Sequence, residues 1–372
     1  MVTVAAASGE RGGGAEPAKA PVAARASHGF WRDAWRRFRR DRTAALALLF
    51  VLFLGLVAAL APLIAGTRPI VCRYKGSIYF PCLAYYYEGG ENPVFFRDGF
   101  REEFPVNLKT KDPDSWAVWP LMFQDPYRRV SSGEWPGDPG NKASQPPSAR
   151  HLFGTDDSAR DIFARVVFGA RIALLVGLVS MGIAGVIGIT AGALAGYFGG
   201  VLDLVISRVI EVSMSIPTLV LILALLSVVE RPGMIHLMAV IGLTRWDSIA
   251  RFTRGEFIRL RESDFVLAAR ALGAPWHRIV FRHILPNALA PVLVTIAFGI
   301  AGAVLLESAL SFLGFGPPPP HPSWGSILDS WRRSMSLWWL AVFPGLAIFL
   351  TVLAYNLVGD GFQEATDPRL RK

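Results

Sequence analysis

Charged residues are scarce in this chain of 372 residues: Asp, Glu, Lys and Arg make up 18% of it, against about 25% in soluble domains. Hydrophobic residues make up 52%, the mean hydropathy is +0.38, and the charges gather in short arginine-rich segments between long uncharged stretches. This distribution argues against a soluble enzyme with one compact core and, for most of the chain, against disorder. It predicts a protein that crosses a membrane several times.

Residues that carry out chemistry are also lacking. There are two cysteines, Cys72 and Cys82, in a polar stretch, and there is no CxxC pair for zinc or redox chemistry. The motifs GxxxxGK[ST], HExxH and GxSxG do not occur, so we expect no nucleotide-binding loop, no metal and no catalytic group in this chain. The sequence therefore predicts a chain that is not an enzyme and holds no cofactor of its own.

The amino-terminal region is basic and begins without a secretory signal. The net charge of the chain is +9, from 38 Lys and Arg against 29 Asp and Glu. Arginine beside membrane spans explains this excess better than a nucleic-acid partner does. Residues 1–28 predict a disordered tail. In 29–42, Trp31, Trp35 and Phe38 recur at helical spacing among arginines, which predicts an amphipathic helix on the lipid surface; a merely basic stretch is the alternative.

Six segments are apolar enough to cross a membrane, and they set the expected fold class: an all-α polytopic membrane protein with six transmembrane helices. The expected spans are 43–65, 171–198, 204–229, 233–250, 284–313 and 334–359. Arg208 and Glu211 lie near the start of the third span, three positions apart, so we expect them to pair along one helix face. The fourth span is the weakest, because its uncharged part is short.

The placement of arginine predicts the orientation, because cytoplasmic loops are enriched in Lys and Arg. Eight arginines lie between positions 245 and 283: Arg245, Arg251, Arg254, Arg259, Arg261, Arg270, Arg278 and Arg282. We therefore expect both termini, the loop 251–283 and the tail 360–372 in the cytoplasm. The segment 66–170 and the loop 314–333 then lie outside.

The outer segment 66–170 is rich in Pro, Gly and aromatic residues, so we expect an irregular cap with short strands around residues 73–80. An oxidising compartment permits a disulfide between Cys72 and Cys82, and two free thiols are the equal alternative. The tyrosines and tryptophans of the cap predict a surface that docks an outer protein or covers the pore entrance. Simple structural packing is the alternative.

Three further features of the spans bear on packing and on solutes. Gly188, Gly192 and Gly196 recur every four residues and predict close contact with a neighbouring helix. Glu307 falls near the outer end of the fifth span, where it either lines a translocation path or is a hydrogen-bonded carboxylate at the interface. We expect His236 at the membrane interface and His321 in a loop, without a second metal ligand near it in sequence.

The segment 251–286 is the most informative. It favours helix up to Leu272, is interrupted by Gly273, can begin a second helix at Pro275, and reaches Pro286. A helix–glycine–helix elbow between two spans predicts a knob that fits a groove on a soluble partner. The alternative is a basic loop that binds anionic lipid.

This segment resembles the EAA loop of the permease subunits of bacterial ABC importers. The loop's pattern of Glu-Ala-Ala, three residues, Gly, nine residues, Ile, one residue and Leu-Pro is matched at Ala268, Ala269, Gly273, Leu285 and Pro286. The chain departs from it at Leu267, where Glu is usual, and at His283, where an aliphatic residue is usual. The resemblance implies that the elbow contacts the ATPases through Asp264, Ala268, Ala269, Leu272, Gly273, Ala274, Trp276, Leu285 and Pro286.

Further stretches of the sequence indicate which branch of these permeases the chain resembles. Residues 151–171 resemble the GTDxxGRDxxSRxxxGAR signature of dipeptide and oligopeptide permeases of the C type, with Ala159 and Ala164 in place of the usual Gly and Ser. Residues 306–325 and 338–371 resemble the final third of those permeases. Residues 73–90 of the cap resemble the enlarged outer loop of the Yej-type branch, which is associated with oligopeptides and microcin C.

The resemblance implies the type I ABC importer architecture in a bacterial inner membrane, with an outer insertion of roughly 100 residues between the first two spans. It implies import of peptides together with a B-type permease subunit, two ATPase subunits that hold ATP and Mg²⁺, and an extracytoplasmic binding protein. A permease of the same family for another solute, such as a nickel chelate, is the alternative. A secondary transporter is a weaker one, because the two halves of the chain show no internal repeat.

Overall fold

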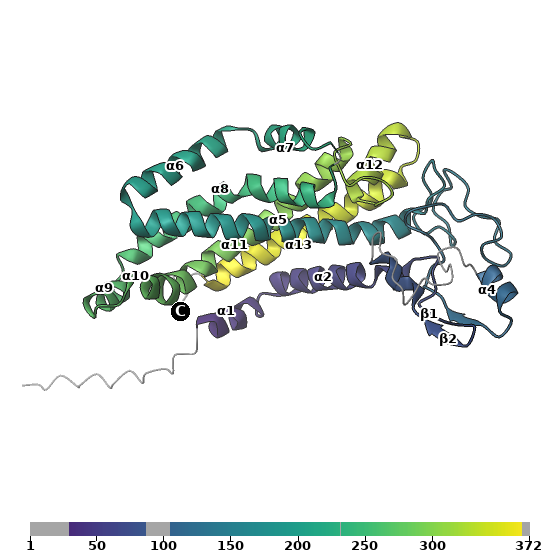
Figure 1. Cartoon of the computed structure of the whole chain (residues 1–372), viewed down its shortest axis with the longest axis horizontal. Helices are drawn as coiled ribbons and strands as arrows, with labels where there is room; N and C mark the ends of the chain where they lie inside the picture. Colours follow the sequence, from purple (N-terminus) through teal and green to yellow (C-terminus); the bar gives the residue numbers. More distant parts are fainter. Residues whose placement is uncertain (1–29, 87–104, 231, 367–372) are drawn as a thin grey trace, which may run out of the picture.

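The computed structural model describes residues 30–86, 105–230 and 232–366; the expected tail at 1–28 lies outside them. Long helices form a bundle, with a cap of short strands and loops at one end and a pair of short helices at the other (Figure 1). The helices are α1 (Phe30–Phe38), α2 (Arg42–Ala59), α3 (Ala61–Ile64), α4 (Pro105–Lys111), α5 (Ile162–Phe198), α6 (Gly200–Ser215), α7 (Thr218–Ser227), α8 (Met234–Arg261), α9 (Asp264–Ala271), α10 (Trp276–Arg278), α11 (Leu285–Phe312), α12 (Trp324–Arg333) and α13 (Trp339–Thr366). A 3₁₀ turn, η1 (Pro81–Tyr85), and a π-helix, η3 (Ile279–Ile284), complete them.

Within the described ranges, four helices are long and apolar enough to span a membrane: α2, α5, the continuous run Trp276–Phe312, and α13. The pair α6 and α7 passes the same test together, which gives up to five. The fourth expected span, 233–250, corresponds to the first part of α8, which continues to Arg261 and carries charged residues along its second half.

The expected third span, 204–229, is not one straight helix. It is divided into α6 and α7, which meet at an angle of 88°. The break is at Ile216, whose extended backbone (φ −93°, ψ 128°) is the conformation that a following proline imposes; Pro217 then starts α7. Arg208 and Glu211 pair on α6 as expected, and both side chains are exposed.

Three other boundaries differ from expectation. The second span begins at Ile162 rather than at residue 171, because the Asp161 carboxylate accepts from the Ala164 amide (2.9 Å) and caps α5 nine residues earlier. The sixth begins at Trp339 and continues to Thr366, beyond 334–359. The loop expected at 314–333 contains a helix, α12, capped by Ser323.

The glycine stripe on α5 packs against α8, as the four-residue spacing predicted. A Cβ added at Gly192 would lie 2.4 Å from the carbonyl oxygen of Ala250, and one at Gly196 would lie 2.6 Å from Cβ of Phe257. A side chain at either position would separate the two helices, so glycine allows their backbones to touch.

The amino-terminal helix α1 lies against the end of α13. Its buried residue Phe38 packs on Phe362, with ring centroids 4.9 Å apart. Trp35 is exposed and lies with four arginines around one hollow: Arg32, Arg36, Arg39 and Arg40. This distribution is the one expected for an amphipathic helix at the lipid headgroups.

The cap contains a three-stranded antiparallel sheet in the order β2 (Ser77–Tyr79), β1 (Val71–Tyr74), β3 (Trp116–Val118). The first two strands fall where the sequence predicted strands. Beside the sheet, the hydroxyl of Tyr85 donates to the Asp125 carboxylate (3.1 Å) and accepts from the Thr67 amide (3.0 Å). Burial, and then the negative charge of Asp125, raise the pKa of Tyr85, so this hydroxyl stays protonated.

The disulfide considered between Cys72 and Cys82 is not formed, and both residues are free, buried thiols. Cys72 lies at the centre of the sheet and packs with Tyr74 and Leu108. Cys82 instead points at the chain before β1, where its Sγ contacts the carbonyl oxygen of Ile70 (3.4 Å). The two thiols thus have separate contacts in the cap, which agrees with the alternative of two free thiols.

Candidate coupling elbow and outer junction

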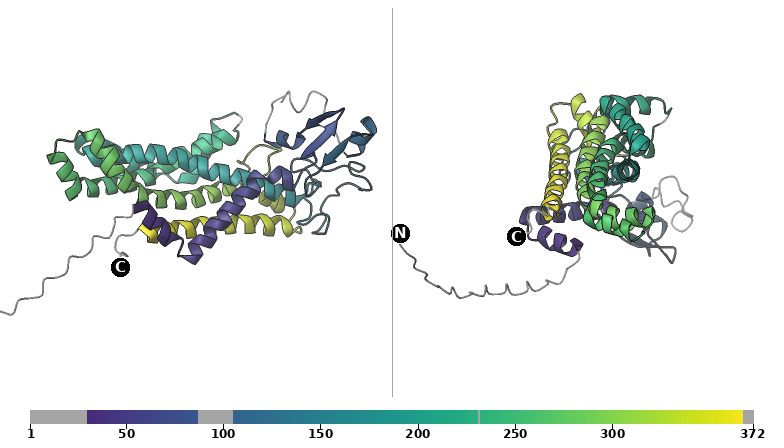
Figure 2. Two further views of the ribbon diagram at one scale, coloured as in Figure 1. Left: turned by 90° about the horizontal axis from the view of Figure 1, so that it is seen from below. Right: turned by 90° about the vertical axis from the view of Figure 1, so that its left-hand side faces the viewer.

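The predicted elbow consists of α9, the four-residue connection 272–275, α10 and η3. It is at the end of the bundle opposite the cap in two perpendicular views (Figures 1 and 2). Asp264 is the first residue of α9, after Ser263 in an extended conformation. Ala268 is exposed and Ala269 half-buried on the same helix. The elbow is thus a helical hairpin that projects beyond the long helices.

Gly273 turns the chain from α9 toward α10. Its φ is +77°, in the left-handed region that glycine tolerates best. The Gly273 amide donates to Arg270 (3.0 Å), and the Ala274 amide donates to Ala269 (3.1 Å). These two bonds form a Schellman motif, which satisfies the last carbonyls of α9 and reverses the chain. The requirement for glycine here is conformational, because a Cβ at Gly273 would meet nothing within 4 Å.

The base of the elbow is packed firmly onto the bundle. Val266 of α9 and Ile279 and Ile284 of η3 are buried against Phe257 of α8. On the same side, the Arg261 guanidinium donates to the carbonyl oxygen of Tyr197 at the end of α5 (3.2 Å). The base of the elbow is therefore in contact with α5, α8 and α11, and a base packed to this density deforms little.

The outer surface of the elbow is apolar. Leu272 is 88% exposed and Trp276 52% exposed, and Trp276 contacts the ring of Phe198 at 5.5 Å between centroids. Sequence reasoning missed two more exposed aromatic residues of the elbow, Phe265 and Phe281; their place within the predicted loop 251–283 was the available signal. Exposed arginines surround them: Arg270, Arg278 and Arg282. An apolar patch with a charged rim is typical of a protein-docking surface.

Leu285 and Pro286 lie at the base of the elbow, not at its tip, and both are half-buried. The π-helix η3 ends where this pair begins. Because Pro286 has no amide hydrogen and its ring crowds the preceding turn, the helix widens before it. The side-chain amide of Asn287 (Nδ2) then donates to the carbonyl oxygen of His283 (2.6 Å). These two predicted residues therefore shape the elbow's attachment and do not contribute to its exposed surface.

At the opposite end, the 151–171 motif joins the cap to the bundle. The buried Asp156 carboxylate accepts from Arg160 Nε (2.8 Å) and from Arg165 Nη1 (2.7 Å). Trp339 of α13 donates from its indole nitrogen to the carbonyl oxygen of Thr155 (3.0 Å), and Trp324 of α12 donates to that of Val166 (2.9 Å). The motif is thus a structural joint between cap, α5, α12 and α13.

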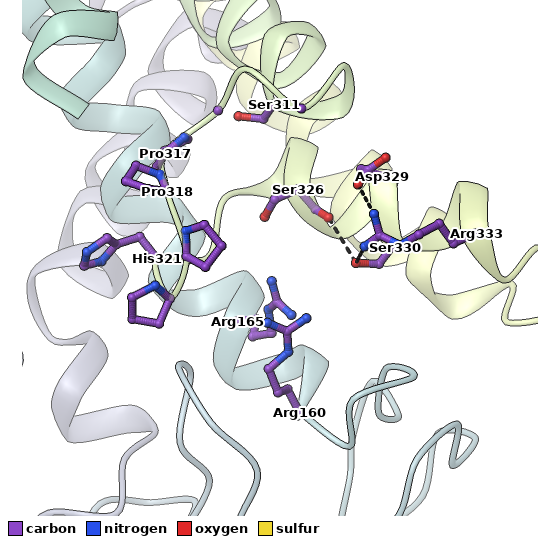
Figure 3. A pocket seen from close by; sticks show the side chains of 14 residues that line it. Arg160, Arg165, Ser311, Pro317, Pro318, His321, Ser326, Asp329, Ser330 and Arg333 are labelled. Carbon is purple, nitrogen blue, oxygen red and sulfur yellow. Dashed lines mark hydrogen bonds and ion pairs between the residues drawn. The ribbon is translucent and has the colours of Figure 1, made fainter. Parts of the chain in front are cut away.

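A pocket of about 260 Å³ opens beside this joint (Figure 3). Arg160, Arg165 and Arg333 line it together with the proline-rich loop that contains His321. All three arginines already contact carboxylates, two of them Asp156 and the third Asp329. Two carboxylates of the chain thus offset part of the positive charge of these three arginines.

Glu307 is fully buried on α11. Its carboxylate accepts from the hydroxyls of Ser311 (2.6 Å) and Ser308 (3.3 Å) on the same helix. This geometry agrees with the hydrogen-bonded alternative rather than with an exposed position on a solute path. His236 likewise has a local role, since its Nδ1 accepts from the Gly233 amide at the start of α8. His321 packs edge-on against Tyr127 of the cap.

Comparison with known proteins identifies the family. Residues 188–372, which include the elbow, match the model described as the binding-protein-dependent transport system inner membrane component. Residues 29–74 match that of the N-terminal TM domain of oligopeptide transport permease C. The inner membrane ABC transporter permease protein YejE of Escherichia coli is 35% identical over 340 residues, which cover 90% of this chain and 96% of YejE. The chain belongs to this family of ABC transporter permeases.

Other members of the permease family match shorter parts of the chain. The dipeptide transport system permease protein DppC of Alkalihalophilus pseudofirmus is 41% identical over 253 residues, 68% of this permease and 80% of DppC. Among solved structures, the MetNI methionine ABC transporter in inward-facing conformations covers 54% of the permease with 22% identity and a TM-score of 0.43. The longer match to YejE agrees with the resemblance of the cap to the Yej-type branch.

Proposed function

We propose that this permease forms half of the translocation path of a bacterial importer of peptides and takes its power from separate ATPase subunits. The elbow is the observation that supports this most: an apolar, arginine-rimmed projection on a packed base suits a groove on a soluble motor. ATP and Mg²⁺ are then held by the ATPases. The peptide as substrate is supported by the relatives named dipeptide and oligopeptide permeases.

The proposal includes a topology. α8 is the fourth of six spans, crossing with its charged second half toward the cytoplasm, and both termini and the elbow are cytoplasmic. The cap then faces outward, where it receives an extracytoplasmic binding protein, and a B-type permease completes the path. The arginines of α1, α8 and the elbow support this orientation, since basic residues gather on the cytoplasmic side.

The docking role of the elbow is tested with Leu272→Glu. Because Leu272 is 88% exposed, the charge leaves the fold intact but opposes burial of the tip in a groove. We expect the ATPases to be lost when the permease is purified, with peptide uptake reduced about tenfold or more. Leu121→Glu is the matched control, since Leu121 is 84% exposed in the cap; it should retain the ATPases.

If the Leu272 variant keeps its ATPases and transports normally, the elbow is not the docking site. The solute is tested separately, by comparing ATP-dependent uptake of a labelled tripeptide and of a nickel chelate by the intact assembly. Uptake of the chelate alone would overturn the assignment to peptides.

A further inference from the structure

Arg245 is the residue on which the expectation from sequence and the structure differ most. Sequence reasoning counted it with the cytoplasmic arginines, at the end of a span. In the structure it lies inside α8, about 17 Å along the helix axis from Met234 at about 1.5 Å per residue. A position near the middle of a membrane about 30 Å thick follows from that distance.

A second helix gives the same depth. The guanidinium of Arg245 lies directly against Gly302 of α11, because a Cβ added at Gly302 would be 2.5 Å from Nη2 and 3.6 Å from Cζ. Gly302 is itself about 15 Å from the end of α11 at Phe312. The cation thus stays at mid-depth across the face of α11, and does not extend toward the headgroups at either end.

Arg245 has no carboxylate partner in the part of the chain that the structure describes: no hydrogen bond or ion pair of its side chain is formed there. Two other arginines of the helical bundle are paired with acids, Arg208 with Glu211 and Arg254 with Asp203. Two buried acids of the same helices have other partners: Asp247 of α8 accepts from Ser213 of α6 (3.1 Å), and Glu307 of α11 accepts from Ser311.

An unpaired arginine at this depth is costly, and charged residues inside a membrane face a bundle interior or a water-filled cavity and mark the pathways of substrates and ions. Arg245 is partly exposed rather than sealed, and Gly302 provides the space beside it that a side chain would fill. The planar guanidinium suits a carboxylate, which it binds through two parallel hydrogen bonds. A lipid phosphate does not reach this depth.

Building on the proposed import of peptides, we propose that Arg245 lines the translocation path and holds the carboxylate of a peptide as it passes the middle of the membrane. An unmodified peptide carries such a group at its C-terminus whatever its sequence. Arg245 would thereby serve many peptides while favouring those with a free carboxyl end.

The test uses the assembled importer in liposomes, with labelled trialanine and its C-terminal amide as probes. Arg245→Gln should reduce uptake of the free acid about tenfold or more relative to uptake of the amide. Arg245→Lys, which keeps the charge, should restore part of that preference. The measured quantity is the ratio of trialanine uptake to amide uptake. Comparing this ratio in each variant with the wild-type ratio cancels any preference of the binding protein, which is the same in all assays.

Gly302→Ala is a second variant that leaves the charge in place. The new methyl group would occupy the position of the guanidinium and displace it, so the preference for the free acid should again fall. Arg208→Gln is the control, because Arg208 is exposed and already paired; it should leave the ratio unchanged.

A parallel fall for both probes, or no change, would overturn the proposal. Loss of the sister permease on purification of Arg245→Gln would also overturn it, since Arg245 would then pair with an acid of that subunit. Failure of the wild-type importer to take up either probe would instead count against peptide import itself.

Discussion

Single residues decide the geometry of the elbow, and Gly273 is the clearest case. Its left-handed backbone closes the Schellman motif at the end of α9 and sends the chain back toward α11. Leu267 and His283, where the chain departs from the family pattern, do not contribute to that turn. The turn therefore survives the loss of the usual glutamate, because its formation depends on backbone hydrogen bonds.

Replacement of Gly273 by valine should misdirect the elbow. A β-branched residue in the left-handed region is strained by about 1–2 kcal/mol or more, so we expect weaker association with the ATPases and slower uptake. The measurement is ATPase co-purification together with peptide uptake. Gly255→Val is the control, because Gly255 lies on α8 and a Cβ there meets nothing within 4 Å. Normal assembly and transport by the Gly273 variant would refute the elbow's role.

The free cysteines give a prediction on pH. Burial raises the pKa of Cys72 to about 11 and also raises the pKa of Cys82. The thiolate is the reactive form, so at pH 8 about one Cys72 in a thousand is ionised. Labelling by a maleimide should be slow in the folded protein and should rise about tenfold per pH unit toward pH 11.

Mass spectrometry after denaturation without reductant checks the same thiols. We expect both cysteines to become labelled at once. Protection of both until a reductant is added would show that they form the disulfide that the structure lacks.

At the scale of elements, the pair of α5 and α8 is the axis of the bundle. Ala250 and Phe257 of α8 lie so close to the glycine stripe of α5 that no side chain fits between the two helix backbones at these positions. The stripe continues to the end of α5, where Arg261 holds the base of the elbow. α5, which packs tightly against α8, is therefore also the helix that connects the elbow with the cap.

Gly192→Ala should destabilise this pair. The added methyl group would lie 2.4 Å from the Ala250 carbonyl, and such overpacking costs about 1–3 kcal/mol. We expect a lower melting temperature in detergent. Gly182→Ala is the matched control on the same helix, since a Cβ at Gly182 meets nothing within 4 Å. Equal melting temperatures for the two variants would show that α5 and α8 are not in close contact.

The sequence predicted these elements unevenly, for physical reasons. Periodicity identified the glycine stripe and the turn at Gly273, because both depend on local spacing. Hydropathy missed the bend at Ile216, since an apolar run has the same composition whether it is straight or broken. Hydropathy also placed Arg245 in the loop that follows the fourth span. Composition alone does not distinguish a charged residue inside a membrane helix from one just beyond the end of that helix.

At the scale of the whole molecule, the two ends are joined by long helices. α5 alone, at 37 residues, is about 55 Å long, enough to cross the membrane and reach both the elbow's base and the cap. At the amino-terminal end of α5, Asp156 and Trp339 attach the cap to α5 and α13. Under the proposed mechanism, a displacement of the elbow is expected to move this end as a rigid body.

The central claim is that this permease generates no power itself and receives it from separate ATPases through the elbow. The most direct measurement is uptake of a labelled tripeptide into liposomes by the full assembly and by the permease alone, each with and without ATP. We predict accumulation against a gradient by the full assembly with ATP, and none by the permease alone. Accumulation by the permease alone would contradict the account.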